Sequence, residues 1–413
     1  MFRKLLTFAE AQRIIHQQFE PKPLGVEEVS LLEATDRVLA EEVKAKLDVP
    51  PFNRSTVDGY AVKAEDTFGA EENRPIALKV CGSVKIGKLP RAKVGQGKAA
   101  EIVTGAPMPE GGDAVVMVEY TELKGEAVLV FSAVGKDENV IKAGADIRKG
   151  ETVLKSGQFL GSREIGVLAA LGLARVKVYA VPRVAVLSTG PEVTEPGRRL
   201  PSGRIYDINA YSLSTAVLES GGKPVFLGVF PDSLDQLGKA LRCALASADM
   251  VVTSGGVSVG PKDVMPKVLN SLRKPGIVVC GIAIKPGKPT VVASVGGKPV
   301  FSLPGHPTSA LLVFYLFVRP MIRLMAGGQA EEGLEVKAFA AMRMFPAKGR
   351  RTFIMVRLKH NKSDQLLAEP VPVSLSSAIT TLARANGFVE IPENLQFIDA
   401  GEMVTVHLFK SRT

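Results

Sequence analysis

The sequence predicts a multidomain chain that combines a doubly wound parallel-sheet α/β domain with β-rich domains. Three observations carry this prediction. The 413 residues exceed what one hydrophobic core usually organises. Between about residues 182 and 327, apolar strands alternate with amphipathic helices. On both sides of that stretch the apolar runs are short, valine-rich and punctuated by glycine, which is typical of β-structure.

The composition is that of a soluble globular protein, with 46% hydrophobic and 23% charged residues. Cys81, Cys243 and Cys280 are widely spaced and form no CxxC pair, which favours free thiols in a reducing cytoplasm. The net charge of +10 suits an anionic partner. Because the basic residues are scattered and tryptophan is absent, a solvated basic surface explains the charge at least as well as nucleic-acid binding. We expect no nucleic-acid partner.

The N-terminal region predicts an amphipathic helix. Thr7 and Glu10 form a capping-box pattern, and the acidic Glu10 also interrupts any signal-peptide core. The longest apolar stretch begins at Thr308 and is the candidate for a membrane span. Arg319 and Arg323 shorten it below the roughly 20 apolar residues that a bilayer requires. We therefore expect a buried core helix and no membrane association.

The elements then follow in order along the chain. A second capping-box pattern, Ser30 to Glu33, predicts a helix that continues to about Val43. The segment 76–154 predicts a β-rich module, and 162–180 predicts a helix followed by a strand.

From Pro182 the pattern changes to strand and helix in alternation, with strands at 183–189, 223–230 and 249–253. A third capping-box pattern, Ser233 and Gln236, opens one of the intervening helices. This alternation predicts a parallel sheet with helices on both faces. After Gly327 short strands return, which predicts a small closing β-barrel or sandwich.

Small and polar residues follow three of the strands predicted in the α/β domain. Ligands of doubly wound sheets bind beyond the carboxyl ends of the strands. Glycines let backbone N–H groups approach an anion, hydroxyls add donors, and a following helix contributes its positive end. One such loop is equally typical of an ordinary strand–helix turn, but three favour a phosphorylated, nucleotide-like ligand. The residues concerned are Ser188, Thr189 and Gly190; Ser254, Gly255, Gly256, Val257 and Ser258; and Pro304 and Gly305.

Carboxylates accompany these loops at Glu192, Asp207, Asp232 and Asp263. An acidic phosphate site would repel its ligand unless a divalent cation such as Mg²⁺ lay between them. The alternative is that the three aspartates cap helices, each worth about 1 kcal/mol. Both roles can coexist.

Lys285 and Lys288 occupy a turn stiffened by prolines, which suits an oxyanion, although two solvated lysines are the alternative. Outside the α/β domain, Asp58, Thr104 and Asp146 stand in loops beside glycine or proline. Residue type alone makes these three ordinary turn residues.

Together the motifs resemble the MoeA-type molybdopterin molybdenumtransferases, a family that includes the E domain of gephyrin. The resemblance extends from Pro50 to Pro392. The matching phrases are "PPFNRSTVDGYAV", "TGAPMPEGGDAVV", "AGADIRKGE", "LSTGPEV", "GRIYDIN", "VTSGGVSVGPKD", "AIKPGKP", "SLPGHPTSA" and "LARANGFVEIP".

The resemblance implies that adenylylated molybdopterin and molybdate react, with Mg²⁺ assistance, to give molybdenum cofactor, AMP and water. It implies a homodimer with the active site between subunits. It also implies that the molybdopterin adenylyltransferase is a candidate partner. A tungstate-inserting paralogue and a non-catalytic scaffold protein of the same fold are the alternatives.

The resemblance also implies four domains. Residues 1–26 and 178–327 would form the α/β domain, and residues 27–48 and 145–177 an elongated linker domain. Residues 49–144 would form a β-rich domain, and residues 328–413 a C-terminal β-barrel.

Finally, the resemblance implies roles for individual residues. The catalytic set would be Asp58, Thr104, Asp146, Glu192, Asp232 and Asp263, of which Glu192, Asp232 and Asp263 would hold the metal. The molybdate set would be Lys285, Lys288, Ser309, Arg350 and Ser377.

Overall fold

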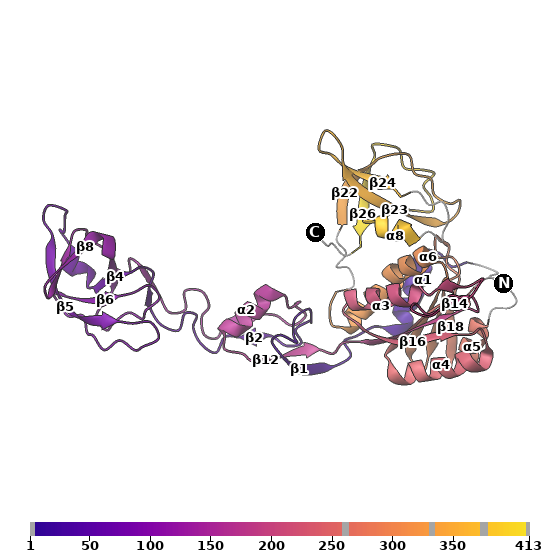
Figure 1. Cartoon of the computed structure of the whole chain (residues 1–413), viewed down its shortest axis with the longest axis horizontal. Coiled ribbons are helices and arrows are strands. Elements are labelled where there is room, and N and C mark those ends of the chain that lie inside the picture. Colours follow the sequence, from indigo (N-terminus) through magenta and orange to yellow (C-terminus); the bar gives the residue numbers. More distant parts are fainter. Residues whose placement is uncertain (1–4, 258–263, 330–334, 372–378, 410–413) are drawn as a thin grey trace. The chain divides into compact units, whose positions relative to one another are not determined.

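The computed structural model describes residues 5–257, 264–329, 335–371 and 379–409 (Figure 1). The chain divides into two compact units. The first comprises the described residues of Met1–Glu28, Asp36–Ala40 and Lys177–Thr413, and the second comprises Val29–Thr35 and Glu41–Val176. The finer division into four domains stays a prediction.

The α/β part of the first unit is built on a six-stranded sheet in the order β16-β13-β17-β21-β20-β18. Its first four strands are parallel, as the sequence predicts. The bounds are β13 (Arg183–Thr189), β16 (Lys223–Phe230), β17 (Met250–Ser254), β18 (Pro275–Cys280), β20 (Val291–Val295) and β21 (Lys298–Leu303).

The sheet departs from a purely parallel arrangement at one edge, because β20 is antiparallel to both β18 and β21. Only Gly296 and Gly297 separate β20 from β21, and both have positive φ, at 61° and 83°. Two such residues form the tight turn of a β-hairpin, which forces the joined strands to be antiparallel.

Helices cover both faces of this sheet, which confirms the doubly wound arrangement. Alternate residues of β13 enter different cores: Val184 and Val186 pack on one side, and Ala185 and Leu187 on the other. Figure 1 shows α4 and α5 on the face opposite α1, α3 and α6. The helix bounds are α1 (Phe8–Phe19), α3 (Asn209–Glu219), α4 (Leu234–Ser247), α5 (Met265–Ser271), α6 (Pro307–Val313) and α7 (Arg319–Met325).

The long apolar segment forms one continuous helix, in which a π-helical stretch (Phe314–Val318) joins α6 to α7. Its length and hydropathy would meet the requirements of a membrane span. However, Phe314, Phe317 and Ile322 are buried within the same core as α1 and the sheet. The segment is therefore a core helix of the domain, as predicted.

A closed five-stranded barrel ends the chain. Each strand pairs with two others, in the cyclic order β23-β24-β22-β26-β25 and back to β23. Their bounds are β22 (Glu335–Ala340), β23 (Arg351–His360), β24 (Leu366–Pro370), β25 (Gly387–Ile391) and β26 (Met403–Leu408). A short strand, β19 (Ile284–Lys285), adds to β23 in parallel, and helix α8 (Ile379–Arg384) lies between β24 and β25 in the chain.

The second unit contains a six-stranded sheet in the order β7-β4-β6-β5-β9-β8, which confirms the β-rich module. The strand bounds are β4 (Gly59–Val62), β5 (Ile76–Val84), β6 (Lys98–Ile102), β7 (Ala114–Met117), β8 (Thr121–Lys124) and β9 (Ala127–Val130). Short two-stranded pairs and one helix precede and follow it in the chain: β1 (Val26–Ser30) with β12 (Arg175–Tyr179), β2 (Val43–Lys44) with β11 (Thr152–Leu154), β3 (Arg54–Ser55) with β10 (Val140–Ile141), and α2 (Ser162–Ala170).

The helix predicted from Ser30 to Val43 is absent. Ser30 ends strand β1, and residues 31–36 form turns. The capping-box bonds nevertheless exist: the Glu33 carboxylate accepts from the Ser30 amide at 3.0 Å, and the Glu33 amide donates to the Ser30 hydroxyl at 3.5 Å. The same reciprocal bonds therefore stabilise an isolated turn, and a helix needs a following amphipathic face that packs.

Candidate functional site

The three loops singled out in the sequence meet at one edge of the sheet. β13, β17 and β21 are parallel neighbours, so their carboxyl ends point the same way. Ser188 is the register partner of Ser254, and Ser254 is the partner of Leu303. The loops that follow the three strands must therefore lie side by side.

A cavity of about 900 Å³ opens at this edge. All the predicted ligand-binding residues that the structure describes line it, whereas Ser258 lies outside the described residues. These lining residues are Ser188, Thr189, Gly190, Ser254, Gly255, Gly256, Val257, Pro304 and Gly305. The volume is within the range of about 300–1,000 Å³ that is common for small-molecule sites.

The backbone passes closely at the base of this cavity, between the ends of β13 and β17. Gly255 has φ +97°, and a Cβ there would lie 2.2 Å from the carbonyl oxygen of Thr189. Only glycine can occupy this position without displacing the neighbouring strand end.

Asn209 connects two of the loops, and residue-by-residue reading of the sequence missed it. Its amide nitrogen donates to the Ser254 hydroxyl at 2.6 Å and to the Gly305 carbonyl at 2.7 Å. These partners are 45 and 96 residues away in the chain, so no local pattern indicates the contact. Asn209 therefore links the second and third loops, which are also joined by the hydrogen bond from the Ser254 hydroxyl to the Pro304 carbonyl at 3.3 Å.

Two of the three predicted metal ligands, Glu192 and Asp232, line the same cavity. The Thr189 hydroxyl donates a short hydrogen bond to the Asp232 carboxylate. Asp263 lies outside the described residues. No cluster of three or more candidate metal ligands is found within the described ranges.

Asp207 also lines the cavity and is 5% exposed. One carboxylate oxygen accepts from the Ala210 amide at 3.0 Å in the first turn of α3, although Ile208 and not Asp207 occupies the N-cap position. The other carboxylate oxygen of Asp207 has no partner among the described atoms, and the same holds for the Ser188 hydroxyl and the Asn209 side-chain oxygen. Buried polar groups rarely remain unpaired, so the walls of this cavity are incomplete without a bound polar species.

This chemistry fits a hard divalent cation. The acidic side chains and the unpaired hydroxyl and amide are all oxygen donors, the type that Mg²⁺ prefers. Cysteine and histidine would favour softer metals, and among the described residues that line the cavity His306 is the one member of either type.

The residues predicted to bind molybdate are distributed differently. Lys285 is exposed on β19, where it is the register partner of Thr352 on β23, two residues after Arg350 in the chain. Lys288 is half-buried on the following turn, and Ser309 is 4% exposed within α6. None of the four described members lines the large cavity, although Pro289 does. Ser377 lies outside the described residues.

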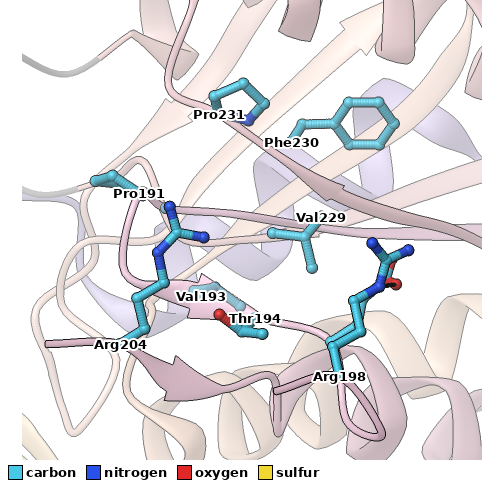
Figure 2. Close-up of a pocket in the computed structure, with 10 residues that line it drawn as sticks. Pro191, Val193, Thr194, Arg198, Arg204, Val229, Phe230 and Pro231 are labelled. Atoms are coloured by element: carbon cyan, nitrogen blue, oxygen red, sulfur yellow. Dashed lines mark ion pairs between the residues drawn. The ribbon is translucent and has the colours of Figure 1, made fainter. Parts of the chain in front are cut away.

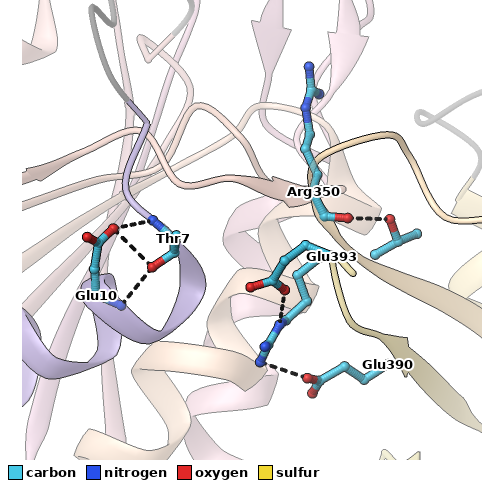
Figure 3. Close-up of polar contacts among 7 residues, drawn as sticks. Thr7, Glu10, Arg350, Glu390 and Glu393 are labelled. Atoms are coloured by element: carbon cyan, nitrogen blue, oxygen red, sulfur yellow. Dashed lines mark hydrogen bonds and ion pairs between the residues drawn. The ribbon is translucent and has the colours of Figure 1, made fainter. Parts of the chain in front are cut away.

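Arg350 and Arg351 have different roles. Arg351 pairs with Glu390 and Glu393, each at 2.9 Å. Figure 3 shows the guanidinium of Arg350 directed away from these carboxylates, while its carbonyl oxygen accepts from a hydroxyl, that of Thr352. Arg350 has no ion-pair partner within the ranges that the structure describes, so of these two arginines it is the one available to an anion.

Asp58, Thr104 and Asp146 belong to the second unit. The Asp58 carboxylate accepts from the Thr104 amide at 2.6 Å and from the Thr104 hydroxyl at 2.8 Å. These two bonds, the amide first, hold the pKa of Asp58 below its ordinary value. Asp146 is exposed, and its amide donates to Val49 at 3.0 Å.

Three family models match the chain in succession. They are the MoeA N-terminal region (domain I and II) over residues 6–172, the probable molybdopterin binding domain over 185–324, and the MoeA C-terminal region (domain IV) over 337–409. The second match contains every described residue that we predict to bind the ligand.

Similar proteins are matched over nearly their full lengths. The molybdopterin molybdenumtransferase of Haemophilus influenzae is 34% identical over 407 residues, which cover 98% of this chain and 99% of that protein. That of Bacillus subtilis is 32% identical, with 97% and 93% covered. A crystal structure of a molybdopterin biosynthesis MoeA protein from Pyrococcus horikoshii superposes with a TM-score of 0.85 at 41% identity and covers 99% of this chain and 100% of that one. The chain therefore belongs to the MoeA family.

Proposed function

We propose that the chain inserts molybdenum into adenylylated molybdopterin, with molybdate as the second substrate, Mg²⁺ as the assisting cation and AMP as the leaving group. The broader role, a molybdopterin molybdenumtransferase of molybdenum cofactor biosynthesis, follows from the family. The observation that carries the finer proposal is the cavity in which the three strand ends, Glu192 and Asp232 come together.

The strand ends would hold the phosphate and the pterin of the substrate. The small residues there leave the backbone accessible, and the hydroxyls of Ser188 and Ser254 supply polar groups. Hydrogen bonds to a charged group contribute about 1.5–3 kcal/mol each, so a few of them suffice for ordinary substrate affinity. The rigid network from Asn209 to Ser254 and Gly305 would keep the loops in position before the substrate arrives.

Glu192, Asp232 and Asp263 would hold the cation. Bound Mg²⁺ would stabilise the negative charge that develops on the phosphoanhydride as AMP leaves. The Thr189 hydroxyl orients the Asp232 carboxylate toward this task, because its hydrogen bond occupies one oxygen and fixes the direction of the other.

Molybdate is a dianion, and it would be bound by Lys285, Lys288, Ser309, Arg350 and Ser377. The pairing of β19 with β23 supports this part of the proposal, because it places Lys285 next to the chain segment of Arg350. Two cationic side chains from different strands suit a doubly charged oxyanion better than either would alone.

We further propose that the protein is a homodimer in which Asp58, Thr104 and Asp146 of one subunit act on the substrate bound by the other. The molybdopterin adenylyltransferase would deliver that substrate. The three free cysteines support a reducing, cytoplasmic location.

The direct test incubates the purified full-length protein with adenylylated molybdopterin, Mg²⁺ and either molybdate or tungstate. We expect AMP release that depends on the oxyanion and is faster with molybdate. Faster release with tungstate would identify the tungstate-inserting alternative. No release with either oxyanion would contradict the proposed function.

A further inference from the structure

A second cavity, of about 400 Å³, adjoins the large one. It lies between the segment from Gly190 to Arg204 and the end of β16 (Figure 2). Gly190, Val193 and Arg204 line both cavities, so these residues form a shared wall. The two cavities are therefore neighbours that meet at these three residues.

Apolar side chains form two facing parts of the wall of the smaller cavity, and polar side chains complete it. Val229, Phe230 and Pro231 come from the end of β16 and the residue after it, and Pro191 and Val193 come from the facing loop. Figure 2 shows Phe230 and Pro231 on one side and Val193 with Thr194 on the other. The slot between these facing apolar side chains suits a planar ring system, which loses little conformational freedom on binding.

Two arginines, Arg198 and Arg204, lie at different ends of this slot. Arg198 is paired with Glu195, with 2.9 Å between Nε and Oε2. Arg204, on the shared wall, has no ion-pair partner in the described part of the chain. Figure 2 shows the two guanidinium groups well separated, with Val193 and Thr194 between them. The guanidinium that is available to bind an anion is therefore that of Arg204, at the junction of the two cavities.

The opposite end carries a matched donor and acceptor. The Glu195 carboxylate accepts hydrogen bonds, and the Arg198 guanidinium donates them. Adenine presents the complementary pair, because its exocyclic amine donates and a ring nitrogen beside it accepts.

We propose that the smaller cavity binds the adenylyl half of the substrate, with the phosphate at Arg204 and the adenine edge at Glu195 and Arg198. This inference rests on the proposed function for the identity of the substrate. The phosphoanhydride would then cross the shared wall, and the pterin would remain in the large cavity near Glu192 and Asp232.

Calorimetric titration of the full-length protein tests the assignment, with AMP, inosine monophosphate, adenosine and inorganic phosphate as separate ligands. We expect AMP to bind more tightly than adenosine or phosphate, because it alone occupies both ends of the slot. Arg204→Met should weaken AMP binding by about tenfold or more, the effect of losing one charge-assisted hydrogen bond. Arg199→Met is the matched control, because Arg199 is exposed and lines neither cavity.

Glu195→Gln tests the recognition of the base. Inosine monophosphate carries a carbonyl where AMP carries the amine, so the wild-type carboxylate should favour AMP. A glutamine amide can donate as well as accept, so the variant should lose much of that preference. Retention of the full preference would overturn the placement of the adenine edge.

Unchanged AMP affinity in Arg204→Met, or an equal loss in Arg199→Met, would overturn the proposed phosphate position. These results are separable from the fate of the proposed function. Wild-type protein that releases AMP from adenylylated molybdopterin, while Arg204→Met binds AMP normally, would refute only the inference about the smaller cavity. Protein that binds AMP through Arg204 but releases none from that substrate would refute only the function.

Discussion

At the scale of single residues, the site depends on a few side chains whose partners are far away in sequence. Asn209 bridges two loops, Thr189 orients Asp232, and Gly255 allows two strand ends to approach. In each of these contacts, a polar side chain or a backbone group of the protein occupies a position that water would otherwise fill. Together these contacts help to define the shape of the cavity.

The pair of Asp58 and Thr104 gives a prediction at this scale. Thr104→Val removes the hydroxyl donor but keeps the amide, so the pKa of Asp58 should rise part of the way toward its ordinary value of about 3.9. Because the folded-state pKa is depressed, the carboxylate contributes stability above the unfolded-state pKa. That contribution is lost as the pH falls through the folded-state pKa. In the variant this contribution should be smaller, and its loss should be complete at a higher pH.

An NMR titration of the Asp58 carboxyl carbon measures this shift. Thr121→Val is the control, because the Thr121 hydroxyl donates to the Val118 carbonyl at 2.9 Å and not to Asp58. A titration midpoint for Asp58 that is the same in wild type and Thr104→Val would show that the hydroxyl has no influence on the carboxylate.

At the scale of elements, two helices predicted to begin with a capping box differ. α1 has the complete box: the Glu10 amide donates to the Thr7 hydroxyl at 3.2 Å, and the Thr7 amide donates to the Glu10 carboxylate at 2.8 Å (Figure 3). α4 forms without it, because the Ser233 side chain makes no capping hydrogen bond. Its stability comes instead from buried residues such as Leu237 and Leu241.

This difference predicts that Thr7→Ala destabilises the start of α1 by about 1 kcal/mol, whereas Ser233→Ala leaves the start of α4 nearly unchanged. Amide hydrogen exchange at the first turn of each helix measures both effects in the intact protein. Equal losses of protection in the two variants would contradict the assignment of the caps.

The elements also show what the sequence can and cannot predict. The alternation of strands and helices predicts the two covered faces of the sheet, and the small residues after β13, β17 and β21 predict the edge that carries the cavity. The helix predicted after Ser30 does not form, because the capping-box bonds are made equally well in a turn. The role of Asn209 could not be predicted, because its partners become neighbours only when the sheet assembles.

At the scale of the whole molecule, the predicted catalytic residues divide between the two compact units. Glu192 and Asp232 belong to the first unit, and Asp58, Thr104 and Asp146 to the second. The proposed homodimer would combine them by placing the second unit of one subunit at the cavity of the other. A monomer that is fully active would be incompatible with this arrangement.

Mixed dimers test that arrangement. Asp58→Asn and Asp232→Asn homodimers should each be nearly inactive. If the residues act across the interface, a heterodimer of the two variants has one site with both changes and one site with neither. Co-expression should then restore up to about half of the wild-type activity per dimer, because one of the two sites is intact. No recovery in purified heterodimers would place both residues in the same subunit's site.

The central claim is that carboxylates at one edge of the α/β sheet support molybdenum insertion through a bound divalent cation. The most direct measurement compares Mg²⁺-dependent AMP release by Asp232→Asn and Asp235→Asn. Asp232 lines the large cavity, whereas Asp235 is exposed on α4 and pairs with Lys239 at 2.7 Å. We predict that Asp232→Asn requires far more Mg²⁺ and turns over at least about tenfold more slowly, while Asp235→Asn behaves like wild type. Wild-type turnover and Mg²⁺ dependence in Asp232→Asn would contradict the account.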